Sequence, residues 1–268
     1  MMFAQSLALS DRGLHYGDGL FETMAVQHGR VRLLPRHMQR LAWGAERLAI
    51  SPPEPAELEA QLNATASALG EGVLKLILTR GGGGRGYAPP ATQSPTLILL
   101  RYPQALPPLD ASPAIELRLC ELPLGRQPRL AGIKHLNRLE YVLARAEWQD
   151  EGIAEGLLLD SEGELIEATA SNVFLCKDGV LLTPILDQCG VAGVMRAQVM
   201  ACAARMGVEL QETRLRLDDV LAADEIFLTN SLHGIRAVQA LRGLRVWPPG
   251  VLTQAVQHAV HDVLRGAA

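Results

Sequence analysis

The sequence has few of the features that mark membrane and secreted proteins. No apolar run approaches the roughly 20 residues that a membrane-spanning helix needs, and the N-terminus has no basic segment followed by an apolar one, as a secretory signal would. Four cysteines are spread over 268 residues, and none forms a CxxC pair. We therefore expect a cytoplasmic protein without a membrane span, whose cysteines are free, buried thiols.

An excess of positive charge is also missing. Lys and Arg number 25 against 29 for Asp and Glu, which gives a formal net charge of −4. A mildly acidic chain lacks the cationic field that binding to nucleic acid requires, so nucleic acid is not an expected partner. An anionic ligand would have to be attracted by a few arginines within a pocket. Hydrophobic residues make up 48% and charged residues 20%, which is ordinary for a folded protein and argues against disorder.

Several common catalytic motifs are absent. There is no GxSxG elbow and no HExxH helix. His258 and His261 are three residues apart on the last predicted helix, but no carboxylate or cysteine completes a set of ligands, so no metal site is expected. The glycine run at 81–86 matches GxGxxG, yet the residues at 87–90 (YAPP) cannot begin the helix that a dinucleotide site requires.

The hydrophobic pattern predicts an α+β fold with two domains, a small N-terminal one and a larger C-terminal one. Expected helices are 35–48, 55–69, 137–149, 193–206 and 249–264, and expected strands are 29–34 (with its turn), 73–79, 96–101, 115–122, 156–160, 172–175, 179–182 and 225–228. The two kinds of element mix without a strict βαβ rhythm, which favours α+β over a doubly wound sheet. Four prolines between Pro103 and Pro113 predict a semi-rigid linker at 106–113, between domains at 1–105 and 114–268.

Two segments of the first half contain residues suited to ligand binding, and each has an ordinary alternative. Residues 11–23 are dense in glycine and charge, so they form either a solvated loop before a strand or a backbone that approaches a ligand closely. Arg80, Arg85 and Tyr87 accompany the glycine-rich loop. That loop is either simply mobile or the rim of a pocket that presents guanidinium groups to substrate carboxylates.

Three segments of the second half have the same ambiguity. Lys134 has the apolar neighbours Ile133 and Leu136. Most lysines are exposed, but a lysine in an apolar site is what a Schiff-base nucleophile needs, because desolvation lowers its pKa. Glu167 precedes small polar residues, which is also typical of a turn between strands. Residues 190–196 form either an ordinary helix start or a phosphate site at a helix N-terminus.

Taken in order, these segments resemble the class IV aminotransferase family, the fold type IV enzymes that use pyridoxal 5′-phosphate (PLP). The shared motifs are Asp11-Arg12-Gly13 with Tyr16-Gly17-Asp18-Gly19, His37-Met38-Gln39-Arg40-Leu41, Lys134 with Leu136-Asn137, Glu167 with Ser171-Asn172, and Gly193-Val194-Met195-Arg196. They extend over nearly the whole chain. The resemblance implies the two-domain α+β architecture of D-amino-acid aminotransferases, PLP as cofactor, and a homodimer.

The resemblance also implies roles for single residues. Lys134 would bind PLP covalently and act as the catalytic base, and Glu167 would contact the pyridine nitrogen. Val191 would pack on the face of the ring, and Asn172 would support the cofactor from the Glu167 side. The implied phosphate contacts are Arg40, the helix start at Gly193, Val194 and Met195, and the pair Asn230 and Ser231. The implied substrate-side residues are Phe21, Arg80, Arg85 and Tyr87.

Within the family, residues 79–87 and 130–140 are similar to members that act as lyases on 4-amino-4-deoxychorismate. This similarity implies a small anionic substrate, the folate precursor 4-aminobenzoate and pyruvate as products, and arginines that meet the two substrate carboxylates. Phe21-Glu22-Thr23 is similar to the aminotransferase members. Transamination of a D- or branched-chain amino acid is therefore the alternative, and a PLP-binding protein or an α+β binding module without turnover is a third interpretation.

Overall fold

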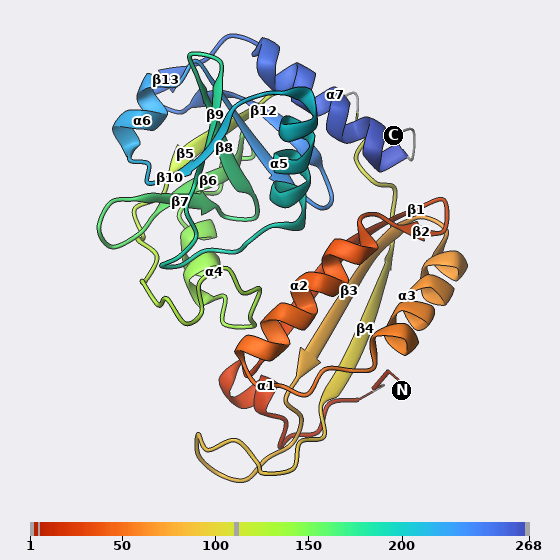
Figure 1. The fold of residues 1–268 in the computed structure, drawn as a ribbon. Coiled ribbons are helices and arrows are strands. Elements are labelled where there is room, and N and C mark those ends of the chain that lie inside the picture. Colours follow the sequence, from red (N-terminus) through yellow and green to blue (C-terminus); the bar gives the residue numbers. More distant parts are fainter. Residues whose placement is uncertain (1–2, 5, 110–112, 266–268) are drawn as a thin grey trace. The chain divides into compact units, whose positions relative to one another are not determined.

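The chain forms two compact units in the computed structural model, which describes residues 3–4, 6–109 and 113–265 (Figure 1). The first unit contains residues 1–106 and the short segment 133–138, and the second contains residues 107–132 and 139–268. Residues 110–112, which belong to the predicted linker, lie outside the described residues. No helix of the described chain is both long enough and apolar enough to cross a membrane.

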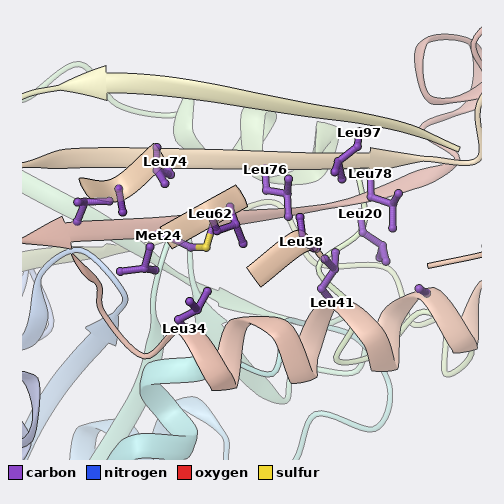
Figure 2. Packing of buried hydrophobic residues seen from close by; sticks show 14 of the residues in the cluster. Leu20, Met24, Leu34, Leu41, Leu58, Leu62, Leu74, Leu76, Leu78 and Leu97 are labelled. Atoms are coloured by element: carbon purple, nitrogen blue, oxygen red, sulfur yellow. The ribbon is translucent and has the colours of Figure 1, made fainter. Parts of the chain in front are cut away.

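The first unit is a four-stranded antiparallel sheet covered by two helices. Its strand order is β2 (Arg30–Val31), β1 (Gly19–Gln27), β3 (Gly72–Thr79) and β4 (Thr96–Pro103). The helices are α2 (Leu34–Arg47) and α3 (Pro55–Leu69), and a five-residue helix, α1 (Arg12–Tyr16), precedes β1. Side chains from both long helices and from the strands form one buried cluster (Figure 2).

Regular spacing of apolar residues produces this cluster. In β1, Leu20 and Met24 are buried and lie on the same face of the strand, since side chains alternate between faces. In α3, Leu58 and Leu62 repeat at four-residue spacing and are likewise buried. The expected strand at 29–34 is shorter than predicted, because α2 begins at Leu34 with a proline in its first turn.

The second unit is a nine-stranded mixed sheet with four helices. The strand order is β10-β9-β8-β11-β12-β5-β6-β7, and β13 pairs with β12. The strands are β5 (Ile115–Leu119), β6 (Ile153–Leu159), β7 (Leu165–Ala168), β8 (Asn172–Lys177), β9 (Val180–Pro184), β10 (Leu210–Thr213), β11 (Glu225–Asn230), β12 (Gly234–Leu241) and β13 (Arg245–Val246). The helices are α4 (Leu139–Arg145), α5 (Val194–Met206), α6 (Leu217–Ala222) and α7 (Val251–Arg265). Helix α5 packs against α7, and both helices contact β11.

Two aromatic rings lie at the centre of this unit. Phe174 of β8 and Phe227 of β11 are directly paired across antiparallel strands, and their ring centroids are 4.9 Å apart in a stacked arrangement. Both side chains are completely buried. The neighbouring residues of the same strands face a second cluster on the other side of the sheet. These strands are therefore buried on both faces.

The predicted α+β class is confirmed, and the long helices lie close to where the sequence placed them. The expected helix at 137–149 is wrong in length: α4 ends at Arg145, because Trp148 turns inward, is 5% exposed and donates its indole N–H to the carbonyl of Ile153. Elements that the hydrophobic pattern missed are α1, β1, α6, β7, β10, β12 and β13. The four cysteines are free and buried, as expected.

Replacing one ring of the aromatic pair tests the core of the second unit. We expect Phe227→Ala to lower the free energy of unfolding by about 3–5 kcal/mol, because it leaves a cavity against Phe174. Val251→Ala, at a residue that is 80% exposed, is the control and should change that free energy by no more than about 0.5 kcal/mol. Urea denaturation measures both, and similar values for the two variants would contradict this account of the core.

Candidate functional site

Lys134 belongs to a segment that extends the edge of the first unit's sheet. The backbone N–H of Phe21 donates to the carbonyl of Lys134 at 3.0 Å, and the N–H of Leu136 donates to the carbonyl of Gly19 at 3.0 Å. The completely buried Ile133 fixes the segment in the core of the unit. The Lys134 amine lies 4.4 Å from the centre of the Phe21 ring. The structure thus brings the predicted catalytic lysine and a predicted substrate-side residue together.

Glu22 lies beside this lysine segment and holds the predicted phosphate ligand Arg40. It faces α2, where Arg40 donates Nε–H to Oε1 at 2.8 Å and its Nη2 pairs with Oε2. His37 Nδ1 lies 2.6 Å from the same Oε2. All three side chains are at least 90% buried. Glu22 and His37 belong to sequence motifs, but neither was predicted to have a role in the site.

The charges around Glu22 decide its protonation. Burial raises the pKa of the Glu22 carboxyl, but Arg40 and His37 outweigh that effect and lower it from 4.5 to about 2. Burial lowers the pKa of His37 and Glu22 raises it, but the charges of Arg40 and Lys134 also lower it, and the pKa lies below its usual value of 6.5. Glu22 is therefore ionised and His37 neutral at pH 7. His37 Nε2 is buried and has no hydrogen-bond partner among the described residues.

Arg80, a predicted substrate-side residue, is buried under the glycine-rich loop. Its guanidinium donates to both Asp18 oxygens at 2.8 and 2.9 Å, and to the carbonyls of Leu48 and Ala49 at 2.8 and 2.7 Å. Burial raises the pKa of Asp18, but Arg80 and Arg12 lower it overall. These four donated hydrogen bonds favour a structural role for Arg80. Other residues of the glycine-rich loop are then the candidates for contact with the substrate.

Arg12 fixes the loop that carries the other two substrate-side candidates. Its guanidinium donates to Asp18 at 2.8 Å and to the carbonyls of residues 86, 87 and 88 at 2.9–3.3 Å. Arg85 and Tyr87 remain exposed on this loop, and a pocket of about 610 Å³ lies between the loop and residues 9–16. The segment at 11–23 is thus a short helix and a strand held by buried ion pairs, and the interpretation as a solvated loop is wrong.

In the second unit, three predicted cofactor residues meet. Glu167 lies on β7 and is 4% exposed. Its Oε2 accepts hydrogen bonds from Asn172 Nδ2 and from the N–H of Val191, both at 3.1 Å. Asn172 also donates to the carbonyl of Val191 at 2.8 Å. The Oε1 atom accepts a hydrogen bond from the hydroxyl of Tyr141, which belongs to none of the sequence motifs and was not predicted to be a site residue.

The start of α5 has the form of an anion site. Gly193 is the N-cap and makes no side-chain capping bond, so the positive end of the helix is not neutralised by a side chain. A Cβ atom on Gly193 would lie 1.9 Å from Asn172 Oδ1, so only glycine fits. Val194 and Met195, the first two helical residues, are buried. This cradle suits a phosphate group.

Ser231 lies in a turn that Asn230 organises. Asn230 Oδ1 accepts the backbone N–H groups of Leu232 and His233 at 3.0 and 2.9 Å, and its Nδ2 donates to Ser171 Oγ at 3.0 Å. These bonds favour a supporting role for Asn230. Within the second unit, a buried carboxylate and a helix N-terminus are the kinds of group that can bind a phosphorylated cofactor.

The Glu22 carboxylate makes the stability of the protein depend on pH. Its pKa is lowered in the folded state, so the stability that it contributes is complete above pH 4.5 and is lost as the pH falls towards 2. The loss should amount to about 3 kcal/mol. We expect Glu22→Gln to be less stable at pH 7 and to lack this part of the pH dependence, as measured by urea denaturation between pH 7 and 2. Glu46→Gln, at an exposed position of α2, should follow the wild type, and parallel profiles for all three proteins would contradict the assignment.

Comparisons with known proteins agree with this geometry. The family described as amino-transferase class IV matches residues 19–241. An aminodeoxychorismate lyase from Vibrio harveyi is 35% identical over 254 residues, which is 93% of each chain. A putative branched-chain-amino-acid aminotransferase from Methanocaldococcus jannaschii is 34% identical over 88% of this chain and 83% of its own.

Solved structures extend the likeness to the fold. The crystal structure of 4-amino-4-deoxychorismate lyase from Pseudomonas aeruginosa is 50% identical, has a TM-score of 0.91 and covers 97% of this chain and 96% of its own. The fold type IV architecture expected from the sequence motifs is thereby confirmed. The chain belongs to the amino-transferase class IV family.

Proposed function

We propose that this protein is a PLP-dependent lyase that converts 4-amino-4-deoxychorismate to 4-aminobenzoate and pyruvate. The observation that carries the proposal is the placement of Lys134 along β1, against Phe21 and next to the Glu22–Arg40 pair. The identities of 35% and 50% to two lyases support this choice within the family. We further propose a cytoplasmic homodimer, in line with the family motifs and the free thiols.

The proposed roles follow from the chemistry of each side chain. Bound PLP supplies an electron-withdrawing ring that stabilises charge on the carbon next to the substrate nitrogen. The Lys134 amine takes the proton from C4 of the substrate ring and returns a proton to the enolpyruvyl group that leaves from C3. The Glu167 carboxylate holds the proton of the pyridine nitrogen. The substrate ring becomes aromatic, which makes the step effectively irreversible.

The remaining residues bind and orient. Arg40, fixed by Glu22, and the start of α5 would hold the phosphate, with Ser231 as a further donor. The exposed side chains of Arg85 and Tyr87 are the candidates for contact with the substrate carboxylates. A guanidinium pairs with a carboxylate through two parallel hydrogen bonds, which fixes orientation as well as charge.

Products separate this activity from transamination. When the purified protein with PLP is mixed with 4-amino-4-deoxychorismate, we expect equal amounts of pyruvate and 4-aminobenzoate without any added 2-oxo acid. Chromatography with a coupled lactate dehydrogenase assay measures both products. Turnover that requires a 2-oxo acid acceptor would show instead that the protein is an aminotransferase, which the 34% identity to an archaeal member keeps as the second candidate.

Removing the lysine tests the catalytic assignment. We expect Lys134→Ala to lose the near-visible absorption band of lysine-bound PLP and at least about 100-fold of the activity, because one amine serves both proton transfers. Lys177→Ala is the matched control, since the side chain of Lys177 is 43% exposed and pairs with Asp224. It should keep the band and the activity. An unchanged spectrum and rate in Lys134→Ala would refute the assignment.

A further inference from the structure

Tyr141 lies seven residues after Lys134 and belongs to none of the sequence motifs. It sits on α4 and is half-buried, and its ring packs against a cluster that includes Leu158 and Ile166. Its hydroxyl donates a hydrogen bond to Oε1 of Glu167. The ring and the hydroxyl therefore have separable roles, because the ring contributes to packing and the hydroxyl contacts a candidate site residue.

The hydroxyl places a donor on the second oxygen of a buried carboxylate. Asn172 and the backbone N–H of Val191 both approach Oε2, whereas Tyr141 approaches Oε1. The loop before Val191 is itself fixed, since Gly190 has a φ of +84° and a Cβ there would lie 2.6 Å from Ile166. Donors on both oxygens fix the plane of the carboxylate and favour its ionised form.

We infer that Tyr141 is a positioning residue that keeps the Glu167 carboxylate ionised and oriented for the pyridine nitrogen of PLP. The inference rests on the proposed function, because it requires Glu167 to be the partner of that nitrogen. Without the phenol, Oε1 loses a charge-assisted hydrogen bond, and the carboxylate rotates and takes up a proton more readily. The pyridine nitrogen then holds its own proton less firmly.

Tyr141→Phe removes the hydroxyl and keeps the ring, so it separates positioning from packing. We expect the protonation midpoint of ¹⁵N-labelled PLP bound to this variant, followed by NMR without substrate, to move down by about one pH unit. The dissociation constant of PLP should rise, and kcat should fall about tenfold while KM changes much less. Tyr102→Phe, at an exposed tyrosine of β4, is the control and should match the wild type in all three measurements.

A double-mutant cycle shows whether Tyr141 acts through Glu167. In a Glu167→Gln background, adding Tyr141→Phe should change kcat less than twofold, because the carboxylate that the phenol holds is already gone. A full tenfold further loss would overturn the inference, as would an unchanged ¹⁵N midpoint in the single variant. Thermal melting followed by circular dichroism confirms that each variant is folded.

The outcomes for the two proposals are distinct. A wild-type protein that binds no PLP, or binds it without releasing pyruvate from 4-amino-4-deoxychorismate, refutes the proposed function. A wild-type protein that does both, together with a Tyr141→Phe variant that matches it in ring protonation and PLP affinity, refutes only the role of Tyr141.

Discussion

Backbone pairing between residues 134–136 and the start of β1 is the constraint on which the rest of the site depends. The chain leaves the first unit after residue 106 and returns to it for the six residues 133–138. Two hydrogen bonds to β1 and the buried side chain of Ile133 hold this return segment. Because the pairing fixes the register, it places the amine of Lys134 against Phe21, where a shift of one residue would point it to the opposite face.

Buried charges explain why the motifs contain so many acids and arginines. Glu22 holds Arg40 and His37, and Asp18 holds Arg12 and Arg80. A buried charge that loses its partner strongly destabilises the folded protein. Replacing a single residue of either set should therefore cost more stability than the loss of one hydrogen bond alone. The same pairs also orient side chains: Arg40 is fixed next to the lysine segment, and Arg12 fixes the glycine-rich loop.

The sequence predicted most of the fold, for reasons that differ between elements, and its motifs supplied candidate site residues, some of which lie together in the structure. Helix α2 has a strong apolar period and was located to within one residue at each end. Short elements such as α6 and β13 lack such a period and were missed. The family resemblance implied that Glu167, Asn172 and Val191 all contact the cofactor. Tyr141 could not be predicted in this way, because it belongs to no motif and its partner Glu167 is distant in sequence. Arg80 resembled a substrate ligand because it adjoins a glycine-rich loop, but its partners on residues 18, 48 and 49 are visible only after folding.

We propose that the amine of Lys134 holds the cofactor, and this is easy to test because the sequence contains only three lysines, at positions 75, 134 and 177. Lys75 is a demanding comparison, since its amine lies 5.4 Å from the same Phe21 ring. The purified protein with PLP is reduced with borohydride, digested, and analysed by mass spectrometry. We expect the pyridoxyl mass on the peptide that contains Lys134. The same mass on Lys75 or Lys177, or on no lysine, would contradict it.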